Sequence, residues 1–358
     1  MRPIFSFIFL LIFWIASAQK TGRALGDSLL IETAGTTNDT LKARLYNRIF
    51  NELTNINIDE AMQYARAGLA HAKKMQWPKG IAVFQNNLGS AYSDKGNYDS
   101  AMYFFQLSLK LQKSVNDKVN MASTYNNMAV AASNIKANFV TASQYYFEAL
   151  AIAEEMKDSA NQANTLNNLA RIFHEQGNFV KALEFENRAF AIIKKTGTAD
   201  DIATSLKTIG NTYYSMGRIK EAQAYFQNSL ALFEGTGNTA GLASIWSSIP
   251  LVYGTNYPRI IEARKKAKGL WNEVNPLHYD AIVNMGNLGV AYLDMVRYDT
   301  NHIYANANDF NKNLLLKEAQ LHLESAIKLA GQIGDIANKN YFTGVLAEAQ
   351  EQMGDFKN

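Results

Sequence analysis

The sequence predicts an all-α protein, a solenoid of antiparallel helix hairpins. Six similar segments follow one another, apolar residues within each segment recur at steps of three and four, and a helix-breaking residue separates the two halves of most segments. Steps of three and four residues place apolar side chains on one face of an α-helix. Self-similarity at a fixed period is typical of repeat folds. With 358 residues, 47% of them hydrophobic, the chain is long enough for such an array.

The first helix of each copy is marked by a pair of residues followed by an apolar and a small residue. These pairs start at residues 86, 126, 167, 207, 247 and 286, so the copies are 39 to 41 residues apart. Glycine or alanine at the small position lets the second helix approach closely, at Gly89, Ala129, Ala170, Gly210 and Gly289. Tyrosines three residues later, such as Tyr92, Tyr213 and Tyr292, are expected to be packing residues.

The second helix of each copy follows a breaker and begins close to an alanine. Gly96, Gly177 and Gly217 supply the left-handed backbone that ends a helix, and Ala137 takes this place in the second copy. The alanines are expected to face the small position of the first helix, and they are Ala101, Ala142, Ala182, Ala222, Ala263 and Ala319.

This pattern of small residue, tyrosine, glycine, aromatic residue and alanine resembles the tetratricopeptide repeat. The usual period of that family is 34 residues, and the longer copies here are similar to those of kinesin light chains and bacterial sensory proteins. The resemblance implies a right-handed superhelix whose first helices line a concave face that binds proteins or peptides without catalysis. It covers about residues 38 to 358, with residues 38–334 forming about seven repeats, including a weaker copy upstream, and residues 335–358 the first helix of an incomplete repeat.

Two copies depart from the pattern. Pro250 stands at the small position of the fifth copy, where it removes an amide donor and clashes with the preceding turn, so this helix should kink or break. The sixth copy has 18 extra residues before Ala319, which predict a surface loop at about 299–316.

The asparagines of the first helices are the candidate binding residues. Asparagine is a mediocre helix former, so its recurrence inside helices needs a reason. The resemblance implies that these amides hydrogen-bond the backbone of an extended peptide, because an amide offers two donors and an acceptor; bonds to neighbouring helices explain them equally well. The candidates are Asn86, Asn87, Asn126, Asn127, Asn167, Asn168, Asn211 and Asn287.

A family motif that grips a C-terminal carboxylate is matched only in part. Lys207 and Asn211 fit its first element, but the next two copies offer Ser248, then Val283 and Asn287, so its basic pair is missing. A basic cluster elsewhere lies on a second helix, where a solvated outer face is expected, and consists of Arg259, Arg264, Lys265, Lys266 and Lys268.

Composition and motifs argue against other function classes. The 35 basic and 32 acidic residues are interspersed, unlike a nucleic-acid-binding surface. The chain has no cysteine, and its five histidines, His71, His174, His278, His302 and His322, do not form a metal-binding pair. The glycine-rich segment 235–241 misses the dinucleotide spacing and is read as a turn between repeats. No enzyme, cofactor or metal is therefore expected.

The N-terminus predicts export. Arg2, an apolar run over residues 4–15 and Ala16-Ser17-Ala18 match a secretory signal peptide cleaved after Ala18, which leaves residues 19–37 as an N-terminal segment. The expected location is the periplasm or the exterior of a bacterium, with no membrane insertion of the mature segment.

The sequence leaves two functions open. One is a free-standing exported scaffold that binds a protein or peptide; the other is the sensory N-terminal region of a longer membrane-bound signalling protein with a kinase or DNA-binding output. The last five residues align with the turn of the third copy but stop one residue before the next repeat alanine. This favours a chain that continues beyond residue 358.

Overall fold

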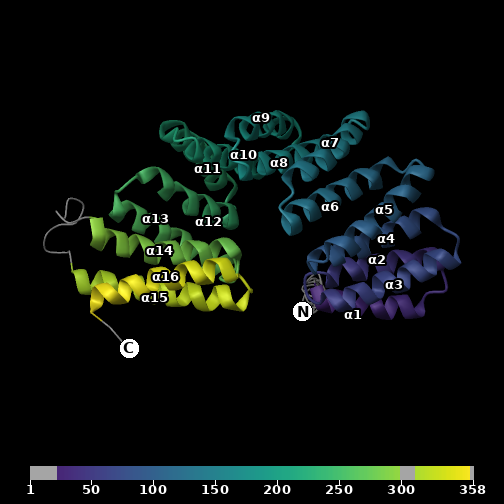
Figure 1. Cartoon of the computed structure of the whole chain (residues 1–358), viewed down its shortest axis with the longest axis horizontal. Helices are drawn as coiled ribbons and strands as arrows, with labels where there is room; N and C mark the ends of the chain where they lie inside the picture. Colours follow the sequence, from purple (N-terminus) through teal and green to yellow (C-terminus); the bar gives the residue numbers. More distant parts are fainter. Residues whose placement is uncertain (1–21, 299–310, 355–358) are drawn as a thin grey trace, which may run out of the picture. The chain divides into compact units, whose positions relative to one another are not determined.

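The computed structural model describes residues 22–298 and 311–354, and over this range it confirms the predicted all-α repeat fold. These residues form sixteen α-helices and one 3₁₀ helix, in two compact units, 1–172 and 173–358 (Figure 1). The first unit holds α1 (Gly22–Gly35), α2 (Asp39–Leu53), α3 (Ile58–Lys74), α4 (Pro78–Asp94), α5 (Tyr98–Ser114), α6 (Lys118–Lys136), α7 (Phe139–Glu155) and most of α8 (Ser159–Glu175).

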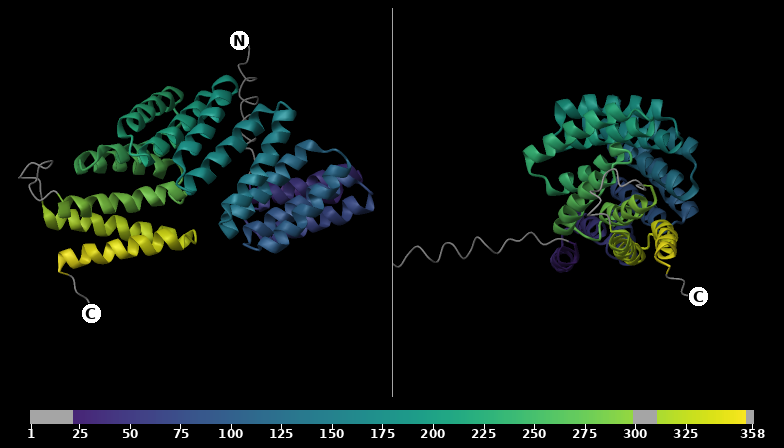
Figure 2. Two further views of the ribbon diagram at one scale, coloured as in Figure 1. Left: turned by 45° about the horizontal axis from the view of Figure 1, so that its top comes forward. Right: turned by 90° about the vertical axis from the view of Figure 1, so that its left-hand side faces the viewer.

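In the second unit, as in the first, the first and second helices of the repeats alternate along the chain (Figure 2). Its helices are α9 (Phe179–Thr196), α10 (Ala199–Ser215), α11 (Ile219–Thr236), α12 (Thr239–Ser248), the 3₁₀ helix η1 (Ile249–Tyr253), α13 (Tyr257–Val274), α14 (Tyr279–Tyr298), α15 (Lys312–Gln332) and α16 (Ile336–Met353). Helices that follow one another pack side by side from α1 to α7 and from α9 to α16.

Small residues bring the two helices of a hairpin together, as predicted. A Cβ atom added to Gly89 on α4 would lie only 2.5 Å from the ring of Phe105 on α5. On α5, the repeat alanine Ala101 is 0% exposed, and so is Phe105, whose ring meets Gly89. Any larger residue at position 89 would therefore push these helices apart.

Many turns between helices share one local pattern. In the turns before α5, α6, α7, α8, α9, α12, α13 and α16, a residue with positive φ follows the preceding helix, and an asparagine or aspartate directly or closely after it caps the next helix. Gly96 has φ +72°, for example, and the Asn97 side chain accepts a hydrogen bond from the Ser100 amide. Ala137, with φ +49°, confirms the predicted alanine breaker. The glycine-rich segment 235–241 is such a turn, because Gly237 is left-handed and Asn238 caps α12.

Pro250 interrupts its helix as expected. The α-helix α12 ends at Ser248, and the chain continues as the 3₁₀ helix η1 before Gly254 turns it with φ +61°. Proline cannot donate to the preceding turn and its ring clashes with it. The first helix of this copy is thus divided into two short pieces.

Two regions differ from the sequence prediction. Residues 22–35, predicted only as an N-terminal segment, form α1, whose Leu29 is 3% exposed and joins the apolar cluster of α2. The helix α15 begins at Lys312, so the end of the predicted loop 299–316 is helical. Residues 299–310 and the predicted signal peptide lie outside the described residues. No helix of the described residues is long and apolar enough to cross a membrane.

Candidate functional site

The asparagines of the first unit link successive first helices. Asn87 on α4 is 8% exposed and donates from Nδ2 to Asn47 Oδ1 on α2 at 2.7 Å. Asn127 on α6 donates to Asn86 Oδ1 at 3.3 Å and to Ser90 Oγ at 3.2 Å, both on α4. These bonds join neighbouring helices, as one of the two interpretations of the asparagines expects.

The row ends in amides with more solvent access. Asn126 is half-buried and accepts from Thr165 Oγ1 on α8 at 3.4 Å. Asn167 is exposed and Asn168 half-buried, and neither has a side-chain hydrogen bond among the described residues. Asn86, Asn126, Asn127 and Asn168 therefore keep part of their surface open, whereas Asn87 faces inward. Binding of a peptide by this row stays a prediction.

The remaining candidates, Asn211 and Asn287, meet in a polar hollow of the second unit. The hollow has a volume of about 170 Å³. Lys207 and Asn211 are four residues apart and so lie on one face of α10. The lining residues come from α10, α12, α13 and α14, and they are Lys207, Asn211, Ser244, Ser247, Ser248, Arg264, Asp280, Val283, Asn284 and Asn287.

Arg264 corrects the sequence interpretation of the basic cluster. It was expected on a solvated outer face, but it is only 9% exposed and lines the hollow. An adjoining hollow of about 310 Å³ is lined by Arg264 and Asn287 together with Pro250 and Gly254. Arg264 thus lies on the second helix of the copy whose first helix is interrupted.

The sequence signal for this burial is weak. Arg264 directly follows the repeat alanine Ala263, and the residues in the same place of two other copies, Met62 and Met102, are 6% and 8% exposed. The same position is half-buried or exposed in the remaining copies, at Ser143, Leu183, Gln223 and Gln320. The four other basic residues of the cluster favoured a solvated outer face.

The guanidinium of Arg264 has few partners. Its Nη1 donates to Asn284 Oδ1 at 3.5 Å, and Asn284 Nδ2 donates back to the Arg264 carbonyl at 3.0 Å. Its Nε is buried without a hydrogen-bond partner. In residues 22–298 and 311–354, no carboxylate forms an ion pair with it. Burial lowers the pKa of Arg264 to about 10, so the group stays charged at neutral pH.

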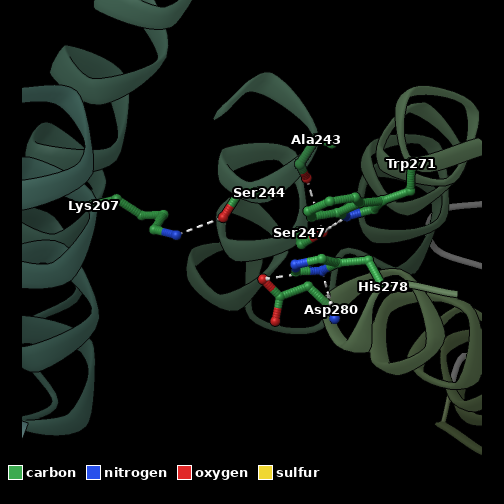
Figure 3. A network of polar contacts seen from close by, with 7 residues as sticks. All are labelled: Lys207, Ala243, Ser244, Ser247, Trp271, His278 and Asp280. Atoms are coloured by element: carbon green, nitrogen blue, oxygen red, sulfur yellow. Dashed lines mark hydrogen bonds and ion pairs between the residues drawn. The ribbon is translucent and has the colours of Figure 1, made fainter. Parts of the chain in front are cut away.

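Lys207 and Asn211 of α10 also line the hollow. Lys207 Nζ donates to Ser244 Oγ, and burial lowers the pKa of this lysine while the carboxylate of Asp280 raises it (Figure 3). Asn211 Oδ1 is a buried acceptor without a partner among the described residues. A buried polar atom without a partner costs about 1 to 3 kcal/mol.

Asp280 lies next to a stack of rings at the start of α14. Its backbone N–H donates to His278 Nδ1 at 3.2 Å, and the His278 ring stacks on Trp271 with centroids 4.6 Å apart (Figure 3). Trp271 Nε1 donates to Ser247 Oγ at 3.1 Å, which ties the stack to α12. The carboxylate itself lies 4.0 Å from His278 Nδ1 and is about half exposed.

The lining of the hollow is polar and charged. No three histidine, aspartate or glutamate side chains within the described residues converge as a metal site requires. The walls of the hollow instead combine two cations, one carboxylate and several amides and hydroxyls. Such a set recognises a polar ligand by charge and hydrogen bonds.

The tetratricopeptide repeat family matches three overlapping stretches of the sequence, residues 80–155, 120–195 and 161–235. Residues 80–235 therefore carry tetratricopeptide repeats, as the sequence pattern predicted. No curated protein matches the chain.

Solved structures share the fold at low sequence identity. Aspartyl phosphate phosphatase F from Bacillus subtilis is 14% identical, with a TM-score of 0.60 over 87% of this chain and 76% of that protein. A Rap protein complexed with Competence and Sporulation Factor is 16% identical, with a TM-score of 0.53 over 93% of each chain. A signal transduction ATPase from Pyrococcus horikoshii with a tetratricopeptide repeat sensor is 15% identical, with a TM-score of 0.57 over 91% of this chain and 51% of that one. At these identities the likeness shows the fold alone.

Proposed function

We propose that this tetratricopeptide repeat chain is an exported, non-catalytic scaffold that holds a protein segment in extended form along its first helices. The observation that carries the proposal is the row of partly open amides on α4, α6 and α8, formed by Asn86, Asn126, Asn127 and Asn168. Each amide offers donors and an acceptor, and so matches the peptide groups of an extended segment whatever its sequence. The Rap protein whose structure contains Competence and Sporulation Factor shares this fold.

The bonds between helices fit this role. Asn127 is anchored by Asn86 and Ser90, so its position is set before a partner arrives. Fixing a contact group in advance lowers the entropy lost on binding. We expect Asn87 to act as a support beneath the row, because its own amide is buried against Asn47.

Export rests on residues 1–18 alone. Intact-mass measurement of the protein purified from its native host is expected to show a chain that starts at Gln19. A mature chain that retains Met1 to Ala18 would contradict export by this route.

A sensory role within a longer signalling protein is the second candidate. The Pyrococcus horikoshii ATPase, in which the repeats are described as a sensor, has the same fold. Sequencing of the native gene past codon 358 distinguishes the candidates, since the sensory role requires an output region there.

The scaffold is tested by substitution on the open amides. After affinity capture of a partner and mapping of its bound segment to a synthetic peptide, the triple variant of Asn126, Asn127 and Asn168 to alanine should weaken binding of that peptide at least about tenfold. Asn187→Ala is the matched control, because Asn187 is an exposed asparagine on the second helix α9. Equal affinity of the triple variant and the control, with unchanged circular dichroism, would assign the asparagines to helix packing only.

A further inference from the structure

The hollow of the second unit contains more positive charge than the fold neutralises. In the described part of the chain, the Arg264 guanidinium has only an amide as side-chain partner, and Lys207 Nζ donates to the Ser244 hydroxyl near the carboxylate of Asp280. Methionine occupies the place of Arg264 in two other copies, so packing at this position does not require a charge. Because burial of a charge is costly unless it is paired, a ligand that pairs it is the simplest reason for its presence.

Two residues that line the hollow have unsatisfied polar atoms. Among the described residues, Arg264 Nε is a buried donor without an acceptor, and Asn211 Oδ1 is a buried acceptor without a donor. The fold therefore leaves hydrogen-bonding capacity unused on both a donor and an acceptor side chain beside the hollow.

Asp280 distinguishes between kinds of charged ligand. A simple anion would be attracted by Lys207 and Arg264 but repelled by Asp280, and a simple cation would meet the opposite pattern. A ligand with both a carboxylate and an ammonium group satisfies all three. His278, stacked on Trp271, lies next to Asp280 (Figure 3).

The size and lining of the hollow limit the rest of the ligand. Its volume of about 170 Å³ is below the roughly 300 to 1,000 Å³ of sites for drug-sized molecules. Val283 is the one apolar residue among the ten that line it, and no aromatic ring is among them. The ligand is thus small and polar, without a large apolar side chain.

We propose that this hollow binds a free α-amino acid, with the carboxylate at Arg264 and the ammonium group at Asp280. Lys207 and Arg264 outnumber Asp280 by one charge, so an acidic amino acid, whose net charge is −1, would leave the site neutral. Its side-chain carboxylate is assigned to Lys207. The proposal does not depend on binding of a protein segment by the first unit.

The test uses isothermal titration calorimetry of the mature chain with L-glutamate, L-aspartate, glycine, N-acetyl-L-glutamate and succinate. We expect L-glutamate or L-aspartate to bind most tightly, and the two compounds without an ammonium group at least about tenfold more weakly. Equal or tighter binding of N-acetyl-L-glutamate or succinate would overturn the proposal in favour of a simple anion site. No binding of any amino acid up to about ten millimolar would also overturn it.

Three variants separate recognition from folding. Arg264→Met, which introduces the residue found in this place in other copies, should reduce amino-acid binding at least about tenfold without loss of helical structure. Asp280→Asn should reduce the preference for L-glutamate over N-acetyl-L-glutamate, a change that a merely structural role would not produce. Arg259→Met is the matched control, because Arg259 is exposed on the same helix and does not line the hollow. An effect of the control as large as that of Arg264→Met, or an unchanged preference in Asp280→Asn, would contradict the assigned contacts.

Discussion

Glu186 gives the second unit a measurable dependence of stability on pH. This glutamate of α9 is 4% exposed, and Thr212 on α10 donates to its Oε1 at 2.7 Å. Its Oε2 is buried without a hydrogen-bond partner in the described part of the chain. Burial raises the pKa of Glu186 from the ordinary 4.5 to about 7, against the opposing effect of the Thr212 hydrogen bond.

The sign of the effect follows from linkage. Below pH 4.5 the carboxyl group is protonated in both the folded and the unfolded chain, so it costs nothing there. As the pH rises toward 7, the unfolded chain loses the proton first, and the free energy of unfolding falls. Above pH 7 the folded chain carries a buried charge that costs about 3 kcal/mol, since each pKa unit corresponds to about 1.4 kcal/mol.

Glu186→Gln keeps the shape of the side chain and removes the charge. We expect no change in the free energy of unfolding at pH 4.5 and a gain of about 2 to 3 kcal/mol at pH 8.5, measured by urea denaturation with circular dichroism. Glu184→Gln on the same helix is the matched control, because Glu184 is exposed and should leave the pH profile unchanged. A variant as sensitive to pH as the wild type, or less stable at pH 8.5, would refute the reasoning.

Two further predictions concern packing and acid stability. Gly89→Ala should destabilise the protein by about 1 to 3 kcal/mol because the new methyl group meets the ring of Phe105, whereas Gly269→Ala, with open space around it, should stabilise by up to about 1 kcal/mol; equal melting temperatures for the two variants would contradict this account. Burial, helped by Lys268, lowers the pKa of His322 to about 4, so stability should fall as the pH drops below the ordinary 6.5, where the unfolded chain takes up the proton. His322→Gln should reduce that loss, by up to about 3 kcal/mol at pH 4, in urea titrations at low pH, and an unaltered acid profile would argue against it.

The sequence predicted the features that depend on local pattern. Gly89 and Ala101 could be placed at the contact between two helices because the spacing of small and apolar residues repeats in most copies. Ala137 could be placed at a helix end by its register, although alanine rarely adopts a left-handed backbone. Pro250 predicted a break because its effect on a helix is chemical and local.

The site could be predicted only in part. Lys207 and Asn211 were identified from one helix, but the burial of Arg264 depends on how α13 packs beside an interrupted neighbour. The Asn87–Asn47 bond connects residues 40 positions apart, and the weak upstream copy concealed its second member. Periodicity shows which face of a helix is inward, but it does not show which polar groups of different helices meet there.

The division of α12 and η1 at Pro250 has a consequence for dynamics. A 3₁₀ helix has poorer hydrogen-bond geometry than an α-helix, and this one is followed directly by the left-handed Gly254. The backbone amides of Ile249 and of residues 251–254 should therefore exchange with deuterium earlier than those of α10 or α14, because segments with weak hydrogen bonds open locally before the whole domain unfolds. Pro250, Gly254 and Arg264 line the adjoining hollow of about 310 Å³. Local opening of this segment would therefore expose the Arg264 guanidinium to solvent. A molecule bound at Arg264 would slow the exchange of these amides.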